Sequence, residues 1–118
     1  MITNMIRVRT DFEGLHCYPN APDEVSFLRQ LHRHKFEVVL DIEVFHLDRE
    51  LEFLMVKNRL DQFISDNIIK ADKHCSCEMY ANMIINFVIG LYGPDRNISC
   101  EVNEDGENGA FVVYSKGI

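Results

Sequence analysis

Three histidines in this chain have the spacing of ligands to a single metal ion. His32 and His34 are two residues apart at the start of a segment in which apolar and charged residues alternate from Phe36 to Val44, the pattern of a half-buried strand. Side chains two residues apart in a strand share a face, so both imidazoles point to the side that becomes apolar further along. His16 ends another alternating segment, again on its apolar side.

Antiparallel pairing of these two segments would bring His16 close to His32 and His34. Three neutral imidazoles with an open fourth position form the catalytic type of zinc site, because structural sites fill all four positions with protein ligands. Taken alone, His32 and His34 have an alternative interpretation, in which they bind no metal and are solvated or hydrogen-bonded near the end of a strand. The third histidine favours the metal site, so we expect zinc as the cofactor.

The remaining pattern predicts the elements that hold these histidines. The expected elements are strands over 5–16 and 31–46, a loop with a helical turn near 25–28, a helix from an N-cap at Asp48 to about 69–70, a helix over 77–91 capped by Ser76, and strands over 98–104 and 110–115. This order predicts one α+β domain over 1–118, with a four-stranded antiparallel sheet and two helices on one face.

Composition narrows the class of protein. The chain has 118 residues, 47% of them apolar, and a net charge of −7. No basic cluster is present for a nucleic-acid partner, and no apolar run is long enough for a membrane span. The N-terminus lacks the apolar segment of a signal peptide, so we expect a cytoplasmic protein without nucleic-acid or membrane partners.

The four cysteines fit a reducing compartment, and we expect them to be reduced thiols. Their spacing matches no strong zinc signature. The alternative is a second metal site, in which Cys75 and Cys77 would bind together with the neighbouring His74.

The histidine segments resemble a known family. Residues 12–16 (FEGLH) and 31–36 (LHRHKF) are similar to the zinc-binding segments of the 6-pyruvoyltetrahydropterin synthase and 6-carboxytetrahydropterin synthase family. Arg33 replaces the usual glycine and points away from the ligands. The resemblance extends from about Ile6 to Tyr114. It implies the tunnelling fold, in which sheets of several subunits join into a barrel with active sites between subunits. It also implies a homo-oligomer, with a hexamer of two trimers as the expected form.

Glu104 is the candidate substrate-binding residue. It ends an alternating strand on the apolar side, where an unpaired carboxylate would be costly. From the pattern alone, the preferred interpretation is a solvated residue in an acidic turn. Residues 102–104 (VNE), however, resemble the family's hydrophobic-x-Glu motif, whose carboxylate anchors the pterin ring through its guanidine-like edge. The resemblance therefore implies a small pterin or purine-like ligand.

The family's catalytic motifs match less closely. Leu28 occupies the position where many members carry a Cys as general base, and the family's Leu-Asp-His motif has no clear equivalent. Asp72 and His74 are the best remaining acid/base pair. We therefore expect a zinc-dependent lyase-like enzyme of pterin or 7-deazaguanine (queuosine-type) biosynthesis, acting on dihydroneopterin triphosphate or a related pterin. The alternative is a catalytically degenerate module that binds zinc and a pterin or purine.

Overall fold

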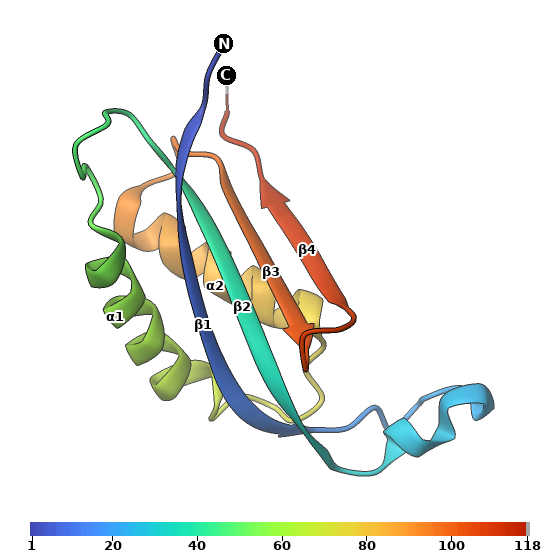
Figure 1. Ribbon diagram of the computed structural model, residues 1–118. Coiled ribbons are helices and arrows are strands. Elements are labelled where there is room, and N and C mark those ends of the chain that lie inside the picture. The colour runs from blue at the N-terminus through green and yellow to red at the C-terminus, as the bar shows by residue number, and fades with distance from the viewer. Residues whose placement is uncertain (118) are drawn as a thin grey trace.

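The computed structural model describes residues 1–117 and shows an antiparallel sheet with two α-helices on one face (Figure 1). The elements are β1 (Asn4–His16), the 3-10 helix η1 (Asp23–Arg29), β2 (His32–Val44), α1 (Phe53–Phe63), the π-helical turn η2 (Ile64–Ile68), α2 (Cys77–Tyr92), β3 (Ile98–Glu104) and β4 (Gly109–Tyr114). The predicted α+β class and antiparallel sheet are confirmed. No helix within the described range is both long and apolar enough to cross a membrane.

The sheet has the order β1-β2-β3-β4, and every neighbouring pair is antiparallel. Strands β1 and β2 form a long ribbon in which His16 faces His32 across the last pair of the ladder. Burial alternates along both strands as the sequence predicts, with Val8, Phe12 and Phe36 turned toward the helices. The pairing that was expected to bring the histidines together is therefore present.

The core lies between this sheet face and the helices. Helix α1 packs against β1, whereas α2 packs against β3 and β4. The largest side chains that are fully enclosed are apolar residues of the central strands and of the inner helix faces: Phe36, Leu40, Ile42, Leu60, Ile68, Ile84 and Ile98. Their removal from water provides the main stabilisation of the fold. Near the start of α2, Tyr80 packs edge-on against Phe12 of β1 and Phe36 of β2.

The N-cap predicted for the first helix is wrong. Glu52, not Asp48, caps α1, and its carboxylate accepts a hydrogen bond of 2.9 Å from the backbone nitrogen of Met55. The preceding segment, 45–51, forms bends and a turn in which Glu50 pairs with Arg96 and accepts from the backbone nitrogen of Phe45. We attribute the later helix start to this long-range Glu50–Arg96 pair, which overrides the local capping signal at Asp48.

Other boundaries differ by small amounts. The first helix ends as a regular α-helix at Phe63 and continues as the π-helical turn η2. Helix α2 begins after Ser76, whose hydroxyl accepts from the backbone nitrogen of Met79 at 3.2 Å, as the sequence predicts. Gly93 ends α2 with a φ of 91°, a conformation that glycine adopts without steric cost. The predicted turn near 25–28 lies within η1, beyond the end of the β1–β2 ribbon (Figure 1).

Candidate metal centre

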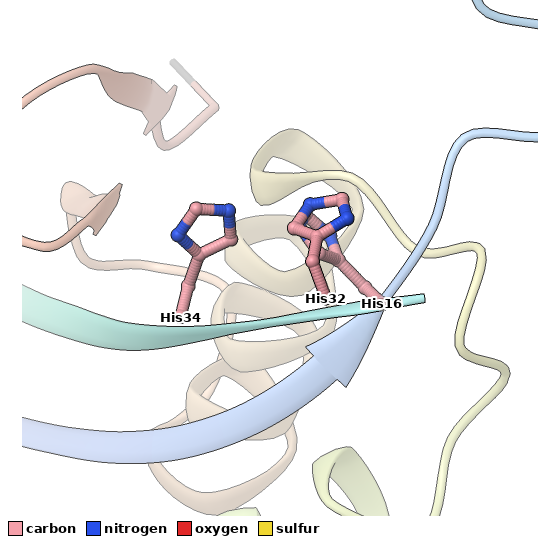
Figure 2. Close-up of side chains that lie close together, drawn as sticks. All are labelled: His16, His32 and His34. Atoms are coloured by element: carbon pink, nitrogen blue, oxygen red, sulfur yellow. The ribbon is translucent and has the colours of Figure 1, made fainter. Parts of the chain in front are cut away.

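The three predicted ligands form a compact cluster at one end of the sheet. His16 comes from the end of β1, and His32 and His34 from the start of β2; their rings stand on the same side of the two strands (Figure 2). The ring centroids are 4.5 Å (His16–His32), 5.1 Å (His16–His34) and 4.8 Å (His32–His34) apart. One ring nitrogen of each histidine lies within 4.8 Å of those of the other two, so the cluster could bind a metal ion.

The outer nitrogen of each ring has its own partner. His16 Nδ1 lies 3.4 Å from the carbonyl oxygen of Cys75, and His32 Nδ1 lies 2.8 Å from that of Gln30. His34 Nδ1 lies 2.7 Å from Oδ2 of Asp105. A carbonyl oxygen can only accept, so Nδ1 carries the proton in His16 and His32. Each Nε2 of the neutral rings then presents a lone pair to the cluster, the tautomer that metal-binding histidines use.

The three Nε2 atoms are the feature that best fits a metal ion. All three are buried and lack a hydrogen-bond partner, which is costly for polar atoms inside a protein. The pKa of His16 is below its ordinary value, chiefly because burial disfavours the charged ring, so His16 is held in the neutral form that binds metal. Tetrahedral zinc with bonds of about 2.1 Å places its donors about 3.4 Å apart, so zinc binding would draw the rings slightly together.

Aromatic side chains form the floor beneath the cluster. The Phe36 ring lies edge-on to His16, with centroids 5.2 Å apart, and stacks on Phe12 at 5.0 Å. A Cβ at Gly14 would stand 3.1 Å from an edge carbon of the Phe36 ring, a tight contact that would require the ring to shift by a few tenths of an ångström. Glycine at this position therefore leaves the space that Phe36 needs beside the histidines. This packing limits the directions in which the imidazoles can rotate.

Glu104 lies beside the cluster. It ends β3 opposite Phe36 in the β2–β3 ladder, so its side chain is diagonal to that of His34 on the same sheet face. Its Oε2 is 3.2 Å from His34 Nε2 and its Oε1 is 3.6 Å from His16 Nε2, although neither contact has the geometry of a hydrogen bond. The side chain is 32% exposed. The predicted face of Glu104 is correct, and the structure adds its closeness to the histidines.

A cleft of about 540 Å³ opens above the cluster. Its lining includes His16, His32, Leu28, Cys77 and Glu104. A cleft of this volume is within the range of small-molecule sites. Leu28 faces the cleft but has no group that could accept a proton.

The predicted acid/base pair lies at the edge of this arrangement. His74 contributes to the cleft lining, and its side chain is 59% exposed. Asp72 is beside it, with Oδ1 accepting from the backbone nitrogen of His74 at 2.8 Å and lying 3.5 Å from His74 Nδ1. Asp72 itself is exposed and outside the residues that line the cleft. The structure therefore brings His74, but not Asp72, to the cleft.

Sequence reasoning missed Asp105 and the position of Cys77. Asp105 follows Glu104 directly and orients His34 through the hydrogen bond described above; an acid next to the predicted site residue was the available signal. Cys77, the first residue of α2, is buried with Sγ 3.9 Å from Glu104 Oε1. Burial, reinforced by Glu104, raises the pKa of the Cys77 thiol to about 12, so the thiol is held protonated.

The alternative metal site at Cys75 and Cys77 is not formed. Within residues 1–117, the three histidines are the only group of three or more His, Cys, Asp or Glu side chains close enough to share an ion. All four cysteines are free thiols. The carbonyl of Cys75 instead serves the histidine site by accepting from His16.

A scan against protein-family profiles gives no match for the chain, and a search of curated proteins gives none either.

Proposed function

We propose that this protein binds zinc through His16, His32 and His34 and acts on a pterin or a related bicyclic purine-like compound. The observation that carries the proposal is the arrangement of the imidazole nitrogens. Each Nδ1 has a partner, and each Nε2 is buried without one. Neutral imidazole suits zinc, copper, iron and nickel. Zinc is preferred because the motifs around these histidines resemble the zinc-binding segments of the tetrahydropterin synthase family.

Glu104 is proposed to recognise the ring. Its partly exposed carboxylate lines the cleft, and two adjacent N–H donors on a planar ring can pair with one carboxylate by bidentate hydrogen bonds. The opening of about 540 Å³ would hold a bicyclic ring with a short side chain. If the Glu104 carboxylate turns away from the histidines to hold the ring edge, the side chain at the opposite end of the ring can lie near them.

The proposed reaction is a lyase-like conversion of dihydroneopterin triphosphate, in pterin or 7-deazaguanine biosynthesis. Bound zinc would polarise the oxygen atoms of the substrate side chain and so ease proton removal from it. His74 is the proposed acid or base at the cleft, since Leu28 cannot exchange a proton and the Cys77 thiol is held protonated. Asp72 would orient the His74 ring.

The second candidate is a binding module of the same ligand class without catalysis. The apolar Leu28 in the cleft and the exposed position of His74 favour this alternative. A general acid or base needs a fixed position within hydrogen-bond reach of the proton that it moves. A largely exposed histidine meets this condition only when the ligand or a neighbouring subunit orders it.

The tunnelling fold and its assembly belong to the same proposal. The element order strand-strand-helix-helix-strand-strand is that of the fold implied by the resemblance. Strands β1 and β4 are the outer strands of the sheet, and joining such edges between subunits into a barrel would satisfy their free backbone groups. We therefore propose a homo-oligomer, with a hexamer as the expected form.

The test is calorimetric binding of neopterin to zinc-saturated protein. Glu104→Gln keeps the shape of the side chain but removes its charge, so it should weaken neopterin binding by about 1.5–3 kcal/mol. Glu78→Gln is the matched control, because Glu78 is an exposed acid of the same cleft lining. Equal affinity of the wild type and the Glu104 variant would remove the ring-binding assignment.

Turnover separates the two candidates. Consumption of dihydroneopterin triphosphate by the zinc-loaded wild type would support the enzyme. Tight neopterin binding without any such turnover would establish the binding module.

A further inference from the structure

The carboxylate of Glu104 faces nitrogen lone pairs. Its Oε1 is 3.6 Å from Nε2 of His16, and its Oε2 is 3.2 Å from Nε2 of His34. Both rings use Nδ1 for other partners, so their Nε2 atoms are acceptors in the neutral rings. Negative oxygens and lone pairs repel one another at these distances unless a positive centre lies between them.

No permanent cation of the protein fills that role. Across residues 1–117, the basic groups within 4.0 Å of the Glu104 carboxylate are these two histidines, and neither lysine nor arginine is among them. A proton on His34 would pair with Glu104, but it would leave the buried Nε2 atoms of His16 and His32 without partners. A single divalent ion held by the three nitrogens would supply the positive charge that the carboxylate beside His16 and His34 lacks.

We propose that Glu104 is a fourth ligand of the metal in the ligand-free protein. In a tetrahedral site with bonds of about 2.1 Å, neighbouring donor atoms are about 3.4 Å apart. Oε2 of Glu104 lies 3.2 Å from His34 Nε2 and Oε1 lies 3.6 Å from His16 Nε2, so a small shift of the carboxylate toward His32 would bring one oxygen to an ion held by the three rings. The strand register supplies the reason, because Glu104 pairs with Phe36, two residues beyond His34, and a long side chain reaches diagonally across.

Four protein ligands would close the site until the carboxylate leaves. This step rests on the ring-binding role proposed above. The Glu104 carboxylate would exchange between the metal ion and the ring of the ligand. The adjacent N–H donors of a planar ring would compete for the same carboxylate, and its departure would open a coordination position beside the bound ring. The site would then remain closed to other small molecules until a ring of the correct hydrogen-bonding pattern arrives.

The first test is zinc affinity, measured by competition with a chromophoric chelator. Replacement of outer partners of metal ligands already lowers metal affinity by about 10- to 100-fold, so Glu104→Ala should weaken zinc binding at least about tenfold. Glu107→Ala is the control for loss of one nearby negative charge, because Glu107 is exposed and outside the cleft lining, and its zinc affinity should stay close to that of the wild type. Equal zinc affinity of Glu104→Ala and wild type would overturn the proposal.

A second measurement can overturn the proposal on the wild type alone. The visible spectrum of the cobalt-substituted wild type reports the coordination of the ion. If Glu104 closes the site, added azide should leave this spectrum unchanged at concentrations that alter it in Glu104→Ala. A wild-type spectrum that responds to azide at low concentration would show an open position and overturn the proposal.

Neopterin distinguishes this proposal from the proposed function. If neopterin binds and shifts the cobalt spectrum of the wild type, both stand. If Glu104→Ala binds zinc as tightly as the wild type but has lost affinity for neopterin, Glu104 is not a fourth ligand and the proposed function stands. If Glu104→Ala loses zinc affinity but the wild type binds no neopterin, Glu104 is a metal ligand and the proposed function fails.

Discussion

Nδ1 of His34 lies 2.7 Å from Oδ2 of Asp105, a residue 71 positions later in the chain. Oδ1 of the same carboxylate accepts from the backbone nitrogen of Lys35 at 2.9 Å, so Asp105 connects the β3–β4 turn to the start of β2. The His34 hydrogen bond is the main reason that the pKa of Asp105 lies below its ordinary value. A carboxylate in this position orients the imidazole and makes its other nitrogen a better metal ligand.

Asp105→Asn should lower zinc affinity by about 10- to 100-fold, the usual effect of changing such an outer partner. Asparagine is the suitable replacement because Asp105 has a φ of 59°, which asparagine tolerates better than most residues. Chelator competition is the measurement, with the exposed Glu107→Gln as control. Unchanged zinc affinity in Asp105→Asn would show that this contact serves only to hold the turn.

His32→Ala should remove most of the zinc from purified protein, since two imidazoles hold the ion far less well than three. Metal per chain after dialysis, determined by elemental analysis, is the measurement. His46→Ala is the matched control, because His46 is exposed and is not in the cluster. Full zinc retention in both His16→Ala and His32→Ala would rule out the proposed centre.

His74→Ala should reduce turnover of dihydroneopterin triphosphate about 10²- to 10⁴-fold if His74 is the general acid or base. Zinc content should stay the same, because His74 is outside the histidine cluster. The turnover number and the metal content are measured on the same samples. A variant as active as wild type would remove the assignment of His74 and leave the metal centre intact.

Glu50→Gln tests a structural contact at the other end of the sheet from the metal centre. Two hydrogen bonds from Arg96, together with one from the backbone of Phe45, lower the pKa of Glu50 from 4.5 to about 2. The ionised form is therefore stabilised by folding. Its contribution is complete above pH 4.5 and is lost as the pH falls toward 2.

Because Glu50 is partly solvated, at 20% side-chain exposure, the substitution should cost about 1–2 kcal/mol of unfolding free energy at pH 7. The difference between wild type and variant should shrink below pH 4, as urea unfolding over this range would measure. Asp48→Asn disrupts an exposed pair with Arg49 and should change stability by less than about 0.5 kcal/mol. A pH-independent difference for Glu50→Gln would contradict the assigned cause.

Sedimentation velocity at micromolar concentration should show a homo-oligomer, with the hexamer as the expected species. Strand β4 carries Phe111 and Val113, which are 65% and 56% exposed in the single chain, and it is an outer strand of the sheet. Exposed apolar side chains on such an edge favour association. A monomer that persists at high micromolar concentration would exclude the proposed barrel.

The sequence by itself determined which face of each strand carries the site residues. Alternation with a period of two is a local property of the chain, so the side of His16, His32, His34 and Glu104 could be assigned before any pairing was known. The structure agrees at all four positions, since these side chains lie together on the helix-facing side. The start of α2 after Ser76 was local as well, because a capping hydroxyl acts within one turn.

Only the tertiary structure decided which of these side chains touch. The distance between Glu104 and His34 depends on the β2–β3 register, which a one-residue slip would change and which no local signal specifies. The contact between Asp105 and His34 needs, in addition, a turn with a positive φ. The start of α1 was mispredicted for the same reason: Asp48 and Glu52 are both possible caps locally, and the distant Arg96 decides between them by holding Glu50 in the preceding segment.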